Sequence, residues 1–303
     1  MSPFSLDQLQ VFAAVVDTGS FSAAARRMNR AQSAVTYAVQ KLEEQVGGSL
    51  FDRAGYRPAL SDTGRALLPR VRRILEEAAA LDAQARSIAG GLEPELSIVV
   101  DSMFPMEMLT SALADFHARY PTVPPRLYVE TLGAAVERIV GGSADLGVVT
   151  EFAASGPGLE RDAVAEVDLV AVAAPDHPLA ELKGELEPDD MRNHVQLVLT
   201  DRSSLTAGRD HGVYASTTWR IADLGAKHEM LRAGLGWGSL PGHMACDDVA
   251  EGRLVRLSPS RWDGGSGMPR LRMVVARRGD RALGPAGGWL WERLVETPAR
   301  QGV

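Results

Sequence analysis

The stretch AQSAVTYAVQKLEEQVG, residues 31–47, predicts a helix with two unlike faces. An apolar stripe is formed by residues at steps of four, three and four, which are Val35, Val39, Leu42 and Val46. Another face carries polar side chains at similar spacing, which are Gln32, Ser33, Thr36, Tyr37, Gln40 and Lys41. The apolar stripe packs on a core, so the open question is what the polar face contacts.

The residues before this helix predict two shorter helical segments. Leu9, Phe12 and Val16 form an apolar stripe, and DTGS then interrupts the chain. The segment SFSAAARRMN follows, with Ser20 or Ser22 available to cap its first amides. Two small helices joined by a tight turn, the second exposing polar side chains, describe a helix-turn-helix. The polar face then lies in the major groove of DNA, although such a face can also be simply solvated.

The residue types on the polar face suit contact with DNA. Gln32 and Gln40 can each offer a donor and an acceptor to adenine, and Ser33 and Thr36 can bond to bases or phosphates. Lys41 suits neutralisation of a phosphate. The segment LFDRAGYRPALS predicts a β-wing, and its two arginines, Arg53 and Arg57, are expected to meet backbone phosphates.

The charge distribution supports this reading. The 303-residue chain carries a net charge of −7, which by itself does not favour a nucleic-acid partner. Residues 1–75, however, contain ten Lys/Arg and six Asp/Glu, so this part is basic and the remainder is strongly acidic. The N-terminus lacks a secretion signal, no apolar run is long enough to span a membrane, and Cys246 has no disulfide partner. A cytoplasmic protein is therefore expected.

Residues 61–91 predict one long helix, with Ser61 or Thr63 as its cap and Gly90–Gly91 at its end. Pro69 removes a backbone hydrogen bond near the start and is expected to kink it. An apolar seam alternates steps of three and four residues through Val71, Ile74, Ala78, Leu81, Ala85 and Ile88. Either this helix packs on its own domain, or the seam pairs with a second copy of the chain.

From residue 92 onward, short apolar strands alternate with helical segments. ELSIVV, RLYVE and ADLGVV are expected strands, and helices are expected between them. The pattern restarts with DLVAVAAP, which indicates two successive α/β lobes with a cleft between them. The whole chain is thus an α+β multidomain protein.

The segment from Leu6 to Gly64 resembles LysR-type transcriptional regulators, through the spacing of SFSAAA, QSAVT, KLEEQVG, LFDR and LSDTG. The resemblance extends over nearly the whole chain. It implies a winged helix-turn-helix at residues 1–60, a dimerising linker helix at 61–91, and an effector domain at 92–303 similar to periplasmic-binding proteins of type 2. Lobe I would comprise residues 92–163 and 268–303, and lobe II residues 164–267.

The resemblance further implies a homodimer that assembles into a homotetramer on double-stranded promoter DNA, with RNA polymerase as a candidate further partner. It implies a small-molecule co-inducer rather than a bound cofactor. Two positions depart from the family pattern. Ala31 stands where a Ser or Thr cap is usual, and Tyr37 stands where Arg or a similar polar residue is frequent.

Candidate effector contacts lie beyond the carboxyl ends of the expected strands, where open α/β sheets bind ligands. They are Ser102, Met103, Phe104, Thr131, Thr150, Thr200, Asp201, Ser203 and, on a later helix, His228. Small polar side chains and helix amides suit a carboxylate-bearing metabolite. The alternative roles are turn and cap residues for Ser and Thr, and packing for Met103, Phe104 and His228.

Two other classes of protein were considered. A transport-associated solute-binding protein fits residues 92–303 but not the N-terminal segment or the missing signal peptide. An α/β enzyme lacks support, because GLGWGS is not followed at once by the helix of a dinucleotide site and no nucleophile elbow is present. No catalytic or metal-binding residues are predicted.

Overall fold

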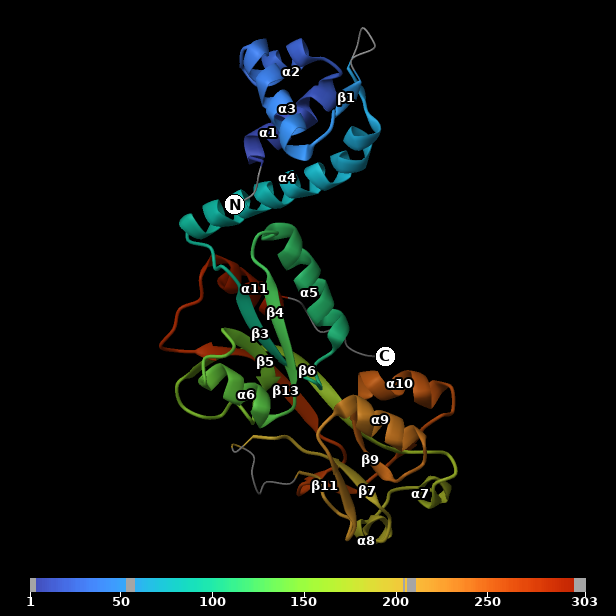
Figure 1. Cartoon of the computed structure of the whole chain (residues 1–303). Coiled ribbons are helices and arrows are strands. Elements are labelled where there is room, and N and C mark those ends of the chain that lie inside the picture. Colours follow the sequence, from blue (N-terminus) through green and yellow to red (C-terminus); the bar gives the residue numbers. More distant parts are fainter. Residues whose placement is uncertain (1–3, 53–57, 204, 206–210, 297–303) are drawn as a thin grey trace. The chain divides into compact units, whose positions relative to one another are not determined.

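The computed structural model describes residues 4–52, 58–203, 205 and 211–296 (Figure 1). The chain divides into two compact units, Met1–Arg86 and Ser87–Val303. Arg53 and Arg57, the expected phosphate contacts of the wing, lie outside the described residues.

The first unit is a small helical domain with a two-stranded hairpin. Its elements are α1 (Leu6–Thr18), α2 (Phe21–Arg27), α3 (Gln32–Val46), β1 (Phe51–Asp52), β2 (Ala59–Leu60) and most of α4 (Asp62–Ala89). Ser20 caps α2 by accepting a hydrogen bond from the Ala23 amide at 3.3 Å, so this serine rather than Ser22 is the cap. Ala31, at the start of α3, makes no side-chain cap, as its methyl group dictates.

The core of the first unit uses the apolar stripes of its helices. Val35, Val39 and Leu42 of α3 are buried against Phe12 of α1 and Phe51 of β1. The rings of Phe12 and Phe51 meet edge to face at 5.5 Å between centroids. This packing fixes the rotation of α3, so its polar side chains are held away from the core.

The long helix α4 begins with Ser61 as its cap, because the Ser61 hydroxyl accepts from the Gly64 amide at 3.0 Å. The helix continues past Pro69 without interruption to Ala89. Its apolar residues serve two faces. Val71 is buried in the core of the first unit, whereas Ile74, Leu81 and Ile88 are 43%, 69% and 44% exposed. The large apolar residues of the predicted seam after Val71 are therefore exposed.

The second unit is built on one continuous twisted sheet whose strands run in the order β4-β3-β5-β13-β6-β9-β7-β8, with β10 beside β6. The strands are β3 (Leu96–Asp101), β4 (Pro125–Glu130), β5 (Leu146–Thr150), β6 (Leu159–Ala173), β7 (Gln196–Leu199), β8 (Thr218–Ile221), β9 (Trp237–Pro241), β10 (Val255–Leu257) and β13 (Arg270–Arg278). A separate small hairpin comprises β11 (Arg261–Trp262) and β12 (Gly265–Ser266). The helices are α5 (Met106–Arg119), α6 (Gly133–Val140), α7 (Pro178–Glu181), α8 (Pro188–Arg192), α9 (Leu224–Arg232), α10 (Gly242–Ala250) and α11 (Pro285–Glu296).

The long strand β6 joins the two lobes. It pairs antiparallel with β13 through Asp168 and with β9 from Leu169. The change of partner therefore falls a few residues after residue 164, where lobe II was expected to begin. The sequence pattern suggested a new strand beginning at Asp168, whereas the structure has one strand spanning both lobes.

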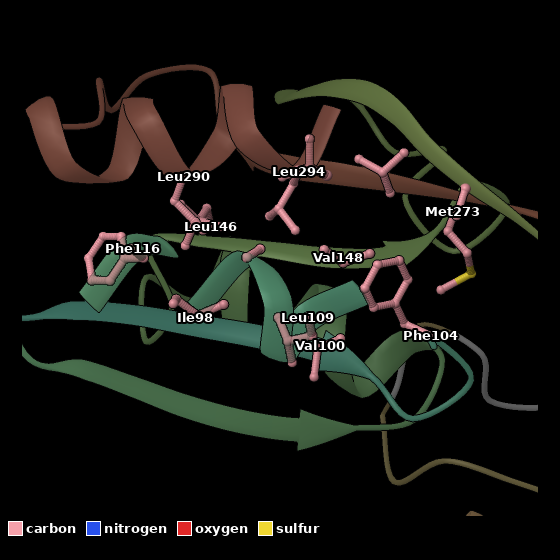
Figure 2. Close-up of a cluster of buried hydrophobic side chains, with 14 of the residues drawn as sticks. Ile98, Val100, Phe104, Leu109, Phe116, Leu146, Val148, Met273, Leu290 and Leu294 are labelled. Atoms are coloured by element: carbon pink, nitrogen blue, oxygen red, sulfur yellow. The ribbon is translucent and has the colours of Figure 1, made fainter. Parts of the chain in front are cut away.

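Helices cover both faces of the sheet in lobe I. Phe116 and Leu109 of α5 and Leu290 and Leu294 of α11 pack with Ile98 and other strand residues on one face (Figure 2). On the opposite face, α6 packs against alternate residues of the same strands. Successive side chains of a strand point to opposite faces, so a sheet covered on both sides needs continuous apolar runs such as SIVV.

Lobe II has the same layered construction. Leu224 and Leu231 of α9 and Ala245 of α10 pack with Val170 and Val172 on one face of β6. On the other face a separate cluster contains Ala171, Ala173, Leu179, Met191, Trp237 and Trp262. Among the residues with a described conformation, no helix is long and apolar enough to traverse a bilayer.

Candidate DNA-reading helix and ligand cavity

The polar face of α3 is accessible over most of its length within the first unit. Gln32, Ser33, Tyr37 and Gln40 are exposed, and Tyr37 retains 62% of its accessible surface. Thr36 is partly buried, and its hydroxyl donates to the Gln32 carbonyl at 3.0 Å. The face therefore presents two amides, a serine and a phenol at its surface, with the threonine set back between them.

Lys41 lies at the C-terminal side of this face and already has partners. Its ammonium group is 2.6 Å from a Glu44 carboxylate oxygen and 5.8 Å from the centre of the Tyr37 ring. The hydrogen bond to Glu44 raises the pKa of Lys41. Both charged groups are solvated, so a phosphate could replace Glu44 at small cost. Sequence reasoning gave no role to Arg26 and Arg27, which are exposed in the last turn of α2.

The second unit contains a cavity of about 310 Å³. Its wall combines lobe I residues Met103, Leu132 and Phe152 with the lobe II residues Leu169, Gln196, Leu197, Val198, Leu199, His211, Gly212, Leu224, Lys227, Ser239, Pro241, Trp262 and Asp263, and with Pro269 and Leu271 at the return to lobe I. Most of this lining is apolar, and a few polar groups are set into it. The composition is that of a small-molecule site.

Of the nine predicted effector contacts, Met103 lines this cavity. Phe104 is instead buried in the lobe I core. Thr150 is fully buried, and its hydroxyl has no hydrogen-bond partner among the residues that the structure describes. Ser102 and Thr131 face each other, with 3.2 Å between their hydroxyl oxygens.

The predicted polar residues after β7 are held by contacts within the chain. The Thr200 hydroxyl donates to the Asp201 carbonyl at 3.4 Å, and the Ser203 hydroxyl donates to the Asp201 carboxylate at 2.9 Å. Asp201 also accepts a hydrogen bond from the Ala134 amide at 3.2 Å. Asp201 belongs to lobe II and Ala134 to the first turn of α6 in lobe I. The Ala134 amide, which also donates to the Thr131 carbonyl at 3.1 Å, is therefore satisfied within the chain.

Asp101 is a second carboxylate beside this junction, and it is fully buried. It accepts from the Met103 amide and from the Leu132 amide, each at 2.9 Å. Burial raises the pKa of Asp101 to about 6, although the two amides act in the opposite direction. The nearby charge of Asp201 adds to the increase. Asp101 thus fixes the backbone of two residues that form the cavity wall, one of which, Leu132, has a positive φ of 50°.

His228 does not line the cavity. It lies in an ion-pair cluster between α9 and α10, where its Nε2 atom is 2.5 Å from an Asp248 carboxylate oxygen. Asp248 also bonds to Arg253 and lies 3.5 Å from Arg232. Burial of Asp248 favours its neutral form, but the hydrogen bonds from Arg253 and His228 prevail and lower its pKa. These contacts give His228 a structural role in joining the two helices.

Sequence reasoning missed Lys227, the neighbour of His228. Lys227 lines the cavity and keeps only 2% of its accessible surface. Burial lowers the pKa of its amino group to about 7. A signal was present, because Lys227 stands three residues after Leu224 and four before Leu231, on the buried stripe of α9.

Both parts of the chain match models of known families. Residues 6–65 match the bacterial regulatory helix-turn-helix protein family of the lysR type, and residues 89–299 match the LysR substrate binding domain. The chain belongs to the LysR family of transcriptional regulators.

Curated relatives of this LysR-family regulator extend over most of its length. The probable HTH-type transcriptional regulator YhaJ of Escherichia coli K12 is 31% identical over 293 residues, which cover 94% of each chain. The HTH-type transcriptional regulator PunR of the same organism is 29% identical, with 82% of this chain and 81% of PunR aligned.

Solved structures share the fold. An OxyR C206 mutant from Corynebacterium glutamicum superposes with a TM-score of 0.54 at 21% identity, covering 97% of this chain and 92% of that one. Full-length LysG from the same species, with bound effector Arg, gives a TM-score of 0.51 at 21% identity over 97% of each chain. The arrangement of a helix-turn-helix followed by a two-lobed α/β domain is confirmed.

Proposed function

We propose that this regulator binds promoter DNA through α3, pairs with a second copy through α4, and responds to a small molecule held between its two α/β lobes. The supporting observation is the polar face of α3, which stays exposed while the opposite face is fully packed. A helix of this kind fits the major groove, where Gln and Ser side chains can bond to base edges. The protein would act in the cytoplasm on double-stranded DNA, and it would have no catalytic activity of its own.

The exposed seam of α4 supports pairing. Ile74, Leu81 and Ile88 place large apolar side chains at heptad spacing on the helix surface, where water would otherwise contact them. Two such helices would bury these side chains against each other. A dimer would also present two copies of α3, and further assembly into a tetramer together with contact to RNA polymerase would complete the regulatory complex.

The cavity supports control by a small molecule. Because lobe I and lobe II both contribute to its wall, a bound molecule changes the relative stability of different lobe arrangements. A regulatory equilibrium responds only to a difference in affinity between its states, and coupling of about 1–3 kcal/mol is typical.

A gel-shift titration with the DNA upstream of the protein's own gene tests the proposal. We expect retardation whose association constant falls linearly with salt concentration on logarithmic axes, because phosphate neutralisation releases counterions. A random-sequence duplex of equal length serves as the control. If own-gene DNA and the DNA of adjacent promoters bind no more tightly than the random duplex, the proposed promoter recognition is wrong.

A further inference from the structure

Lys227 occupies a buried position of α9 at which the neighbouring residues on the same face are apolar. The buried residues of α9 are Leu224, Lys227 and Leu231, which share the face that packs on the lobe II sheet. Both leucines belong to the apolar cluster that also contains Leu197 and Leu240. The methylene stem of Lys227 can take such a place, but its amino group cannot do so without cost.

The sheet beneath Lys227 leaves space for this long side chain. A Cβ atom at Gly238 of β9 would lie 3.3 Å from the Cε atom of Lys227 and 2.6 Å from the carbonyl oxygen of Leu197. A side chain at position 238 would therefore collide with β7 and crowd the lysine. Glycine at this point keeps the stem close to the strand and the end of the side chain at the cavity.

The amino group has no charged partner within the described part of the chain. The Nζ atom of Lys227 makes no hydrogen bond or ion pair with a described residue, and burial is the sole cause of its lowered pKa. This differs from Asp248, a buried charge of the same lobe, which is paired with Arg253 and His228. A buried cation without a counterion is destabilising for the fold and is typical of a functional site.

We propose, on the basis of the proposed function, that Lys227 binds the charged group of the effector, and that the effector is a small monocarboxylate with an apolar body. The carboxylate supplies the counterion that the described part of the chain does not provide. The apolar wall, which includes Met103, Leu197 and Trp262, receives the rest of the molecule.

The other polar groups of the cavity indicate that the effector carries one negative charge rather than two. The Gln196 side chain is largely occupied, because one N–H of its Nε2 donates to the Gly212 carbonyl and its Oε1 accepts from the Tyr214 and Ala215 amides. Asp263 accepts from the Gly212 amide at 2.5 Å and has His211 at 3.5 Å. A second carboxylate on the effector would meet the negative charge of Asp263.

The cavity also limits the size of the effector. Its volume of about 310 Å³ lies at the small end of the range of roughly 300–1,000 Å³ for ligand pockets. A small aromatic or branched aliphatic acid therefore suits this space.

The test compares acids with their neutral amides on the full-length protein. Benzoate, phenylacetate and 4-methylpentanoate are titrated against benzamide, phenylacetamide and 4-methylpentanamide by calorimetry and thermal shift. We expect the wild type to prefer at least one acid over its amide by tenfold or more. Lys227→Met keeps the apolar stem without the charge, and we expect it to lose this preference while still binding the amide.

Lys183→Met is the matched control, since Lys183 is an exposed lysine of the same lobe. It should bind acids as the wild type does. Three outcomes would overturn the proposal: no acid of the panel binds the wild type at millimolar concentration, the amides bind as tightly as the acids, or Lys227→Met retains the preference. If Lys227→Met fails to fold, the acid-to-amide comparison on the wild type still decides the matter.

The gel shift with wild-type protein separates this inference from the proposed function. Promoter binding together with absence of acid binding would reject the ligand class alone. Absence of promoter binding would reject the regulatory proposal, whatever the calorimetry gives.

Discussion

Lys227 carries its proton in the unfolded chain up to a pH of about 10.5, whereas burial lowers its pKa to about 7 in the folded protein. Between these values the unfolded chain binds more protons, so this residue makes the free energy of unfolding rise with pH from about 7 to about 10. Below pH 7 the buried amine is charged in the folded protein as well, and its destabilising effect is complete. We expect Lys227→Met to remove this slope and to be more stable than the wild type at pH 6.

Urea denaturation at several pH values between 6 and 10 measures this effect. The other titratable groups of the cavity wall, His211 and Asp263, are present in both proteins and cancel in the difference. Lys183→Met should follow the wild-type curve. A curve for Lys227→Met that runs parallel to the wild type over the whole range would show that the amine is compensated in the folded state.

Gln32 is the first residue of α3 and has an exposed amide side chain. We expect Gln32→Ala to change base preference within the operator, with a loss of about 1–3 kcal/mol of discrimination at one base pair. Competition binding with a set of single-base operator variants measures the change. Gln45→Ala, an exposed glutamine near the other end of the helix, is the control. Unchanged affinity and preference in Gln32→Ala would mean that α3 meets DNA with another face.

Single residues show where sequence reasoning succeeds and fails. Val35 and Leu42 could be assigned to the core because they repeat at helical spacing among polar neighbours. The cavity wall could not be assigned in this way, since Leu169, Trp262 and Leu271 come together only when the two lobes meet. Ser and Thr side chains that follow strands were predicted to contact the effector, but the hydroxyl groups of Ser102 and Thr131 hydrogen-bond to each other. Their contact with an effector stays a prediction.

At the scale of elements, the start of α4 packs on the first unit, whereas its later turns expose apolar residues that could pair with a second copy. Val71 anchors it to the first unit, and the later apolar residues are exposed. We expect Ile74→Asp to yield monomers in analytical ultracentrifugation, because a dimer would bury two unpaired carboxylates in its seam. Ala83→Asp places the same charge on the opposite side of the helix, at an exposed position, and should leave the oligomer intact. If Ile74→Asp sediments like the wild type, the copies pair elsewhere.

Long elements with a strong periodicity could be predicted from the sequence, and short ones could not. The segment that forms α3 and the strand β13 have stripes or apolar runs that define them. Helix α10 was not predicted, because GHMACDDVA has few large apolar residues and a buried Asp248. That aspartate is stable there only because Arg253 and His228, from other parts of the chain, reach it. Such a pairing depends on tertiary structure and has no local signal.

At the scale of the whole second unit, one hydrogen bond links the lobes at the first turn of α6. The Ala134 amide has a second acceptor, the Thr131 carbonyl at 3.1 Å, so Asp201→Ala removes one of its two hydrogen bonds. We expect its rate of hydrogen exchange to increase, because the lobes lose a restraint on their relative position. Hydrogen exchange followed by mass spectrometry measures this rate in the peptide containing Ala134. Asp189→Ala removes an exposed acid of lobe II and is the control. Equal exchange in both variants would show that Asp201 does not restrain the lobes.

The overall architecture was predictable because its signals extend over many residues. The change from helical spacing to alternating strands and helices near residue 92 indicated two kinds of domain, and the motif spacing from Leu6 to Gly64 indicated the family. The family and the fold class are confirmed by the matches to both family models. The exact lobe limits could not be derived, since β6 remains one uninterrupted strand where its partner changes from β13 to β9.

The position of β13 has a consequence for mutations that truncate the protein. This strand comes late in the chain, yet it lies between β5 and β6 in the middle of the sheet. A nonsense codon shortly before Arg270 would spare the helix-turn-helix and nearly all of lobe II, but it would leave β5 and β6 with unpaired inner edges. Such alleles should therefore yield aggregated or degraded protein, and constitutive regulators should arise from missense changes instead.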